Sequence, residues 1–179
     1  SEMGQGIHTS LASLLAEELE ISMDQISSLE TIHHPAFRNE PIKFLTGGVM
    51  DGQMTGGSLS LVGFYGPFRK MGATAREMLR GAAAGHWGVS IDQCRAASAR
   101  ITNTTTGKSL GYGELAGAAA RQAVPEDPPL KSPDTFRLIG KAVPRVDTPA
   151  KVDGSAVYGN DVELPGMLYG AVRHCTLFH

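Results

Sequence analysis

Apolar positions recur at helical spacing in three parts of the chain. In residues 9–20, four leucines fall on one helical face: Leu11, Leu14, Leu15 and Leu19. Residues 67–88 carry the clearest pattern, at Phe68, Met71, Ala75, Met78, Leu79 and Ala82. Pro67 is suited to the first turn of that helix. The alanine-rich residues 112–121 predict a third, shorter helix.

Alternation of polar and apolar positions is weaker and predicts short strands. Residues 24–31 read as one strand. Residues 100–103 and 108–110 indicate a hairpin that turns at Thr106-Gly107. Residues 155–173 return to strand-like patterning near the end of the chain.

Two stretches follow neither period. Residues 33–54 form a long loop, and loops of that length are often functional. Its adjacent His33 and His34 would point to opposite faces of an extended chain, which favours an ordinary loop over a metal site. Residues 124–150 contain six prolines: Pro125, Pro128, Pro129, Pro133, Pro144 and Pro149. Because this stretch also has apolar anchors, we expect an extended strap lying on other protein surface.

These patterns predict an α+β fold in three parts. Residues 1–123 are helical with short strands, residues 124–150 form the strap, and residues 151–179 begin a separate sheet. The acidic residues Glu17, Glu18 and Glu20 stand near the end of the first helix, where the helix dipole disfavours negative charge. We interpret them as a solvated acidic edge.

Composition narrows the class of protein. The chain has 179 residues, 41% of them hydrophobic and 19% charged, with a net charge of −2. These values are typical of a globular protein and give no basic surplus for binding nucleic acid. No apolar run reaches the roughly 18 residues needed to span a bilayer. Cys94 and Cys175 lack metal-site spacing and are interpreted as ordinary thiols, with a disulfide left open.

Two glycine loops carry the candidate chemistry. One is Gly4-Gln5-Gly6, directly before the first helix, and the other is Thr55-Gly56-Gly57-Ser58-Leu59-Ser60, shortly before the second. Glycine lets the backbone approach a ligand closely, and the N–H groups at a helix start are donors beside a positive dipole end. The loops therefore predict a clamp on an anionic or strongly hydrogen-bonding cofactor. The candidate cofactor-binding residues are Gly4, Gln5, Gly6, Thr55, Gly56, Gly57, Ser58 and Ser60. Thr9 either contacts the same ligand or caps the helix.

An ordered series of motifs resembles a known family. In the first half these are Met3-Gly4-Gln5-Gly6-Ile7-His8-Thr9, Ala16-Glu17-Glu18-Leu19, Thr55-Gly56-Gly57-Ser58 and Gly72-Ala73-Thr74-Ala75-Arg76-Glu77-Met78-Leu79. In the second half they are Tyr112-Gly113-Glu114-Leu115-Ala116, Phe136-Arg137-Leu138-Ile139-Gly140, Arg145-Val146-Asp147-Thr148-Pro149-Ala150-Lys151-Val152-Asp153-Gly154 and Leu164-Pro165-Gly166-Met167-Leu168. The series resembles the large subunit of the molybdenum hydroxylases, the xanthine dehydrogenase and aldehyde oxidase family. The resemblance is to the bacterial branch typified by the isoquinoline 1-oxidoreductase beta subunit.

The resemblance implies a cofactor, a reaction and a domain plan. The cofactor is molybdenum held by molybdopterin, often as the cytosine dinucleotide in bacteria. The reaction is hydroxylation of an N-heterocycle or oxidation of an aldehyde, with water as the oxygen source. Electrons leave through a small iron–sulfur subunit. Residues 1–123 would be part of the molybdopterin-binding domain, 124–150 the connecting strap, and 151–179 the beginning of the hammerhead domain.

The family's catalytic glutamate belongs to a motif that this sequence does not contain. We therefore assign no catalytic residue and no metal ligand, and expect an internal stretch that is inactive and without cofactor in isolation. Its partners would be the rest of the large subunit and the small subunit, with self-association through uncovered apolar surface. Cytoplasm and periplasm both stay open.

Two alternatives remain at the level of sequence. One is a non-catalytic assembly or remnant protein that binds partner chains. The other is a generic phosphate or nucleotide binder, which is disfavoured because neither loop has the lysine-bearing P-loop pattern.

Overall fold

The computed structural model describes residues 1–27, 29 and 32–174. It divides the chain into two compact units, Ser1–Val146 and Asp147–His179. Cys175 lies outside the described residues, whereas Cys94 carries a free and buried thiol.

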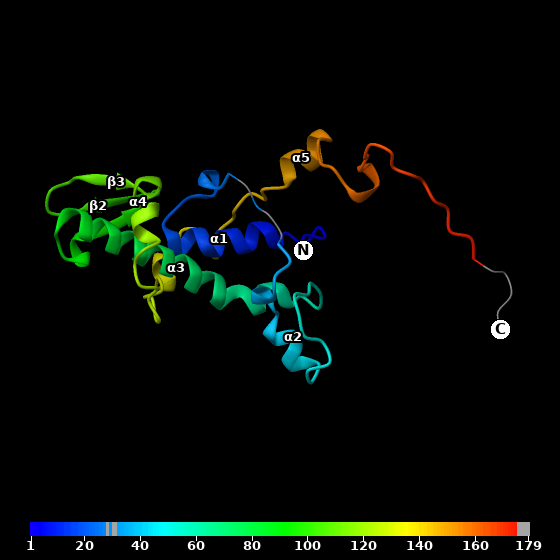
Figure 1. Cartoon of the computed structure of the whole chain (residues 1–179), viewed down its shortest axis with the longest axis horizontal. Coiled ribbons are helices and arrows are strands. Elements are labelled where there is room, and N and C mark those ends of the chain that lie inside the picture. The colour runs from blue at the N-terminus through cyan, green and yellow to red at the C-terminus, as the bar shows by residue number, and fades with distance from the viewer. Residues whose placement is uncertain (28, 30–31, 175–179) are drawn as a thin grey trace. The chain divides into compact units, whose positions relative to one another are not determined.

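Two parallel helices form the framework of the first unit. They are α1 (Ile7–Leu19) and α3 (Leu59–Trp87). They lie side by side and begin at the same end of the unit (Figure 1). Close approach depends on Gly72, because a Cβ built there would lie 2.6 Å from the carbonyl oxygen of Leu15. The predicted first helix is confirmed, with bounds shifted by a few residues.

The second helix begins earlier than the sequence predicts. α3 starts at Leu59, and Pro67 lies inside it instead of in its first turn. Proline removes one helical hydrogen bond, and the helix nevertheless continues through it although several residues of the preceding turns, such as Val62, are exposed. Asn39 donates to the carbonyl of Leu59 at 3.3 Å, and Phe64 lines a cavity together with residues of α1.

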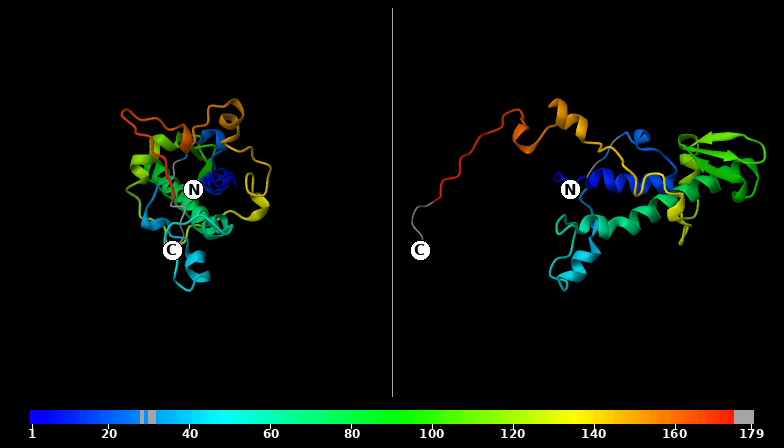
Figure 2. Two further views of the ribbon diagram at one scale, coloured as in Figure 1. Left: turned by 90° about the vertical axis from the view of Figure 1, so that its right-hand side faces the viewer. Right: turned by 180° about the vertical axis from the view of Figure 1, so that it is seen from behind.

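A small antiparallel sheet lies against the far end of α3 (Figure 2). Its strands follow chain order: β1 (Cys94–Ala97), β2 (Arg100–Asn103) and β3 (Ser109–Gly111), followed by α4 (Tyr112–Ala119). The hairpin of β2 and β3 and the third helix are confirmed, whereas β1 was not predicted. The core between these elements consists of Leu79, Ala82, Ala83, Ala84, Cys94, Ile101, Leu115 and Ala119.

The strand expected over residues 24–31 is wrong for the residues that the structure describes. The segment starts with a 3-10 turn, η1 (Met23–Gln25), and no described residue of the range belongs to a strand. Residues 28, 30 and 31 lie outside the described part. A local bond, in which Ser22 N donates to Gln25 Oε1 at 3.0 Å, satisfies this amide without a partner strand.

The long loop that follows contains short helical pieces. They are η2 (Pro35–Phe37) and α2 (Glu40–Leu45), and α2 contacts α3. Later in the chain, η3 (Ile91–Gln93) connects α3 to β1. Residues 120–146 contain one such turn, η4 (Pro133–Thr135), and otherwise run as irregular chain.

The second unit contains α5 (Thr148–Asp153) and the turn η5 (Gly159–Asp161). The strand-like pattern of residues 155–173 is therefore a wrong prediction, because none of these residues belongs to a strand. Alternation alone does not form a strand when the described unit supplies no neighbour to pair with. The fold as a whole is mixed helix and small antiparallel sheet, in agreement with the α+β class.

Candidate functional site

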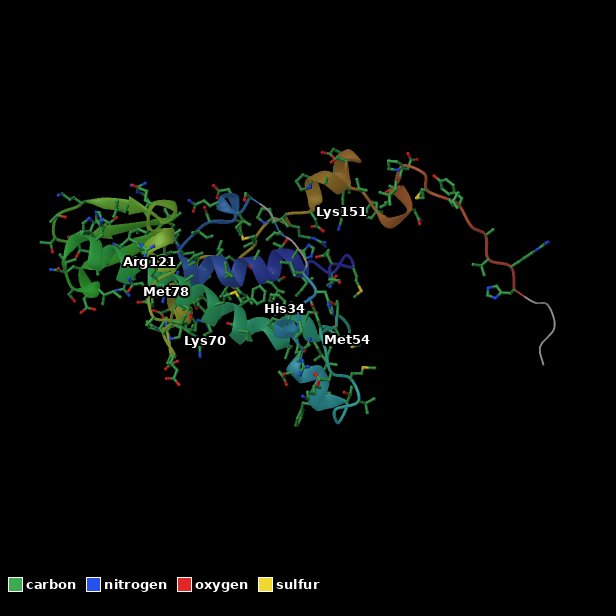
Figure 3. The ribbon with its side chains drawn as sticks, viewed as in Figure 1. His34, Met54, Lys70, Met78, Arg121 and Lys151 are labelled. Carbon is green, nitrogen blue, oxygen red and sulfur yellow. The ribbon has the colours of Figure 1, made fainter. Side chains whose placement is uncertain are left out.

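The two predicted glycine loops meet at the end of the first unit where α1 and α3 begin. The amino nitrogen of Ser1, three residues before the first loop, donates to Thr55 Oγ1 of the second loop at 2.7 Å. Because the helices are parallel, both positive dipole ends lie at this end of the pair. Figure 3 shows the labelled side chains of His34 and Met54 here, whereas Met78 lies toward the other end of α3.

The first loop forms a cradle for a negative charge. The carboxylate of Glu2 accepts from the backbone N–H groups of Gly4 at 2.8 Å, Gly6 at 2.9 Å and His8 at 3.2 Å. Gly6 takes φ 82°, a conformation that L side chains rarely adopt. Arg145 donates to the carbonyl of Gly4 at 2.9 Å and pairs with Glu2. The start of α1 therefore holds an anionic oxygen, supplied here by the chain itself.

Gln5 makes its hydrogen bonds within the same loop. Its Nε2 donates to the carbonyl of Ser1 at 2.8 Å, and its Oε1 accepts from the N–H of Met3. Thr9 does not cap α1, whose N-cap residue is Gly6, and the carboxylate of Glu2 serves as the side-chain cap instead. The hydroxyl of Thr9 is buried and accepts from the N–H of Val146 at 3.1 Å.

The second loop differs from the first because no described side chain caps its helix. Gly57 and Ser58 both take left-handed φ, at 56° and 58°, and both are solvent-accessible. Ser58 is the N-cap of α3, yet its hydroxyl makes no capping bond. Thr55 and Gly56 are partly buried, and Ser60 is buried in the first turn. Unlike those of α1, the amides at this helix start receive no cap from a side chain.

Two cavities adjoin the loops, each of about 340 Å³. The first is mainly apolar and includes Thr55 and Ser60 on its wall. Its apolar lining includes Ile7, Leu11, Leu15, Phe37, Phe64 and Phe68. The second is more polar and has Gln5 and Gly6 on one side. The predicted residues thus lie at one end of the helix pair, but each cavity has only two of them on its wall, and Gly4, Gly56, Gly57 and Ser58 line neither.

Glu17 and Glu18, at the other end of α1, are buried. Their exposed fractions are 1% and 0%, so the expected solvated edge is wrong for both. Glu18 Oε1 lies 2.7 Å from Arg69 Nη2, and Glu18 Oε2 lies 3.3 Å from Arg76 Nη1. Glu18 also accepts from the N–H of Lys131 at 3.0 Å. Paired and hydrogen-bonded, a buried carboxylate avoids the cost that makes an isolated one unfavourable.

Glu17 binds the chain segment that follows η4. It pairs with Lys131 and accepts from the N–H groups of Arg137, Leu138 and Ile139 at 2.8, 2.6 and 3.2 Å. Burial raises the pKa of the Glu17 carboxyl, but the bonds from Lys131 and the three amides outweigh it and hold the pKa below its ordinary value.

A signal for this cluster existed in the sequence. Arg69 and Arg76 are seven residues apart and so lie on one face of α3, where they need anionic partners if that face is buried. The sequence could not identify Glu17 and Glu18 as those partners. Arg69 and Glu18 are separated by 51 residues, and only the packing of α1 on α3 brings them together.

The described residues contain no group of three or more His, Cys, Asp or Glu side chains arranged to hold a metal ion. His34 caps η2, where its Nδ1 accepts from the N–H of Ala36 at 3.1 Å. Within the same part of the chain, no helix combines the length and apolar character needed to cross a bilayer.

Comparisons with known proteins agree with one another. Residues 1–162 match the family model of the molybdopterin cofactor-binding domain. The beta subunit of isoquinoline 1-oxidoreductase from Brevundimonas diminuta is 33% identical over 96% of this chain and 26% of that protein. A nicotinate dehydrogenase subunit from Pseudomonas putida is 33% identical over 96% of this chain and 13% of its own length. A membrane-bound aldehyde dehydrogenase (pyrroloquinoline-quinone) of Gluconacetobacter polyoxogenes is 33% identical over 95% of this chain and 21% of that protein. The chain thus spans about a quarter or less of each relative.

Proposed function

This chain belongs to the molybdopterin cofactor-binding domain family of the molybdenum hydroxylases, and we propose that its two glycine loops form part of the wall that holds a molybdenum–pyranopterin cofactor. One observation carries the proposal. A hydrogen bond from Ser1, three residues before the first loop, to Thr55 of the second brings the two loops together where two parallel helices begin, so both loops lie beside a pair of positive dipole ends.

The residues present fit such a ligand. The amides of Gly4, Gly6 and His8 already bind a carboxylate, so this turn is able to hold an anionic oxygen. The Gln5 amide can donate and accept, as a pterin edge requires. In the second loop the N-terminal amides of α3 have no side-chain cap, and the hydroxyls of Thr55, Ser58 and Ser60 belong to the same short stretch of chain.

The cofactor and the chain would have different roles in the reaction. When bound, the cofactor supplies the two-electron oxidation of an N-heterocycle or an aldehyde, with water as the oxygen source. The residues that hold it are Gly4, Gln5, Gly6, Thr55, Gly56, Gly57, Ser58 and Ser60. They bind and orient the cofactor and contribute positive electrostatic potential. The general base is expected from another part of the large subunit, so the chain alone would be inactive.

The wider assembly is part of the same proposal. The cofactor would be the cytosine dinucleotide form, and electrons would leave through a small iron–sulfur subunit. Residues 1–123 would belong to the molybdopterin-binding domain, 124–150 to the strap, and 151–179 to the start of the hammerhead domain. Exposed apolar residues of α2 and the loop after it, such as Phe44 at 85% and Val49 at 87% exposure, support contacts with partner chains or self-association.

Metal analysis of the full-length product, co-expressed with its small subunit, tests the cofactor. We expect about one molybdenum per complex, as for a resident cofactor. A complex without molybdenum would contradict the proposal if a control enzyme loads in the same cells. Because one relative is named for pyrroloquinoline quinone, the same sample is assayed for that quinone, and quinone in place of molybdenum would also contradict it.

Variants then test the loops themselves. The double substitution Gln5→Ala with Ser58→Ala should lower molybdenum content while the complex still assembles. The matched control is Ser155→Ala, an exposed serine in the second unit. Wild-type molybdenum content in the double variant would show that these two side chains do not hold the cofactor.

A further inference from the structure

The carboxylate of Glu17 organises a stretch of irregular backbone. Three consecutive N–H groups, those of residues 137–139, point at the same oxygen, Glu17 Oε2. Its other oxygen, Oε1, binds Lys131. Because residues 137–146 have no helical or strand ladder of their own, this side chain is a major source of their order.

The backbone that Glu17 holds continues directly into the wall of the polar cavity. That wall is formed by Leu138, Ile139, Gly140, Lys141, Val143 and Arg145. Gln5 and Gly6 lie on the same cavity from the side of α1. At its end the segment returns to the first loop, where Arg145 donates to the carbonyl of Gly4 at 2.9 Å. One side chain therefore anchors the near end of a wall whose far end contacts the glycine loop.

The neighbouring acidic residues have different roles. Glu18 pairs with Arg69 and Arg76, so it ties α1 to α3. Glu20 pairs with the side chains of Lys131 and Arg137. Glu17 differs from both because it holds the main-chain donors of residues 137–139, and these fix the path of the segment itself.

We propose that Glu17 is a positioning residue, which fixes residues 137–145 as the wall that faces Gln5 and Gly6 and so sets the width of the polar cavity beside the first glycine loop. The inference rests on the proposed function, since the ligand affected would be the cofactor held at that loop. Glu17 itself touches no ligand in this proposal. It acts through the amides of residues 137–139.

Glu17→Gln tests the proposal with little change in size. The amide retains one acceptor oxygen, but its NH2 group cannot accept from a backbone N–H, and the negative charge opposite Lys131 is lost. Hydrogen bonds to a charged group contribute about 1.5–3 kcal/mol, so amide exchange should accelerate about ten- to hundredfold. Glu20→Gln is the control, since it removes an adjacent charge whose ion-pair partners are side chains.

Two readouts separate this inference from the proposed function. Hydrogen–deuterium exchange of the full chain should show faster exchange over residues 137–145 in Glu17→Gln, with α3 peptides and Glu20→Gln unchanged. In the full-length complex, Glu17→Gln should also lower molybdenum content relative to Glu20→Gln. If Glu17→Gln does not fold, Glu17→Asp keeps the charge, withdraws the carboxylate by one methylene, and should show a smaller change in both readouts.

Each outcome decides the question. Unchanged exchange over residues 137–145 would overturn the claim that Glu17 holds them. Faster exchange with full molybdenum content would overturn the positioning role. If the wild-type complex carries no molybdenum, the proposed function fails, whereas the exchange result still reports whether Glu17 orders the segment.

Discussion

The two ends of the α1–α3 pair are built in opposite ways. Where the helices begin, glycine loops and two cavities surround them, and backbone donors at the start of α3 have no side-chain cap. Farther along, Glu17 and Glu18 are buried among cationic partners and backbone amides. We call the end with Glu17 and Glu18 the closed end, because paired charges fill it, and the end with the glycine loops the open end, because two cavities adjoin it.

Packing follows the same division. At the closed end, Gly72 lets α3 approach the backbone of α1 so closely that an added Cβ would lie 2.6 Å from Leu15 O and 2.9 Å from Glu18 Cβ. At the open end, Ile7 of α1 and Phe64 of α3 line a cavity of about 340 Å³. Substitutions at the two ends should therefore change the free energy of unfolding by different amounts and for different physical reasons.

The largest effect is expected from Glu18→Ala. It leaves the buried Arg69 and Arg76 without their shared carboxylate. Breaking a buried ion pair from one side costs about 3–5 kcal/mol, and denaturant unfolding of the chain measures it. Glu126→Ala, at an exposed position, is the control and should change the free energy of unfolding by less than about 0.5 kcal/mol. Equal effects of the two would show that the closed end is not held by this cluster.

Gly72→Ala should destabilise the chain by about 1–3 kcal/mol, because the new methyl group collides with the backbone of α1. The matched control is Gly85→Ala, in the same helix, where an added Cβ meets nothing within 4 Å. That change should stabilise α3 by about 0.5–1 kcal/mol through helix propensity. Thermal or denaturant unfolding of both variants gives the comparison, and a shared sign would contradict the close packing at Gly72.

Acid should weaken the closed end by protonating Glu17. The folded-state pKa of Glu17 lies below its ordinary value of 4.5, so its stabilisation is complete above that value and is lost as pH falls through the folded pKa. The groups that face Glu17 are Lys131 and the amides of residues 137–139. The difference in unfolding free energy between wild type and Glu17→Gln should therefore narrow between about pH 7 and about pH 3. A constant difference across that range would contradict the assigned pKa direction.

The smallest effect is expected at the open end. Ser58 holds a left-handed φ of 58°, which is unfavourable for any residue with a Cβ. Ser58→Gly should raise the free energy of unfolding by at most about 1 kcal/mol. Ala99→Gly, at φ 58° in the turn between β1 and β2, should raise the free energy of unfolding by a similar amount, because it relieves the same left-handed strain. A loss of stability at Ser58 alone would show that its hydroxyl has a structural role in the loop.

Local sequence predicted much of the helical framework. The apolar spacing located α1, most of α3 and α4, and the turn residues located the β2–β3 hairpin. Prediction from local sequence failed where contacts with another segment decide the secondary structure. Pro67 is typical of a helix start, but α3 begins at Leu59 and continues through it. Strand-like alternation in residues 155–173 forms no strand, since alternation needs a partner to pair with.

The candidate site shows the same limit. The glycine loops were recognisable because glycine at a helix start has a local meaning, and the bond from Ser1, just before the first loop, to Thr55 brings them close together. Whether the predicted residues bind the cofactor stays a prediction. Residue types alone could not predict that Glu2 binds the amides of the first loop. Nor could they predict that Gln5 and Ser60 line different cavities.

By itself, the sequence determined the amphipathic helices, the glycine loops and the family, because each is encoded by residues close together or by an ordered series of motifs. Only the tertiary structure decided which charges are buried. Glu18 meets Arg69 across 51 residues and Glu17 meets Ile139 across 122. An acidic residue at a helix end looks the same whether it faces water or a buried arginine, and its environment exists only once distant segments have packed together.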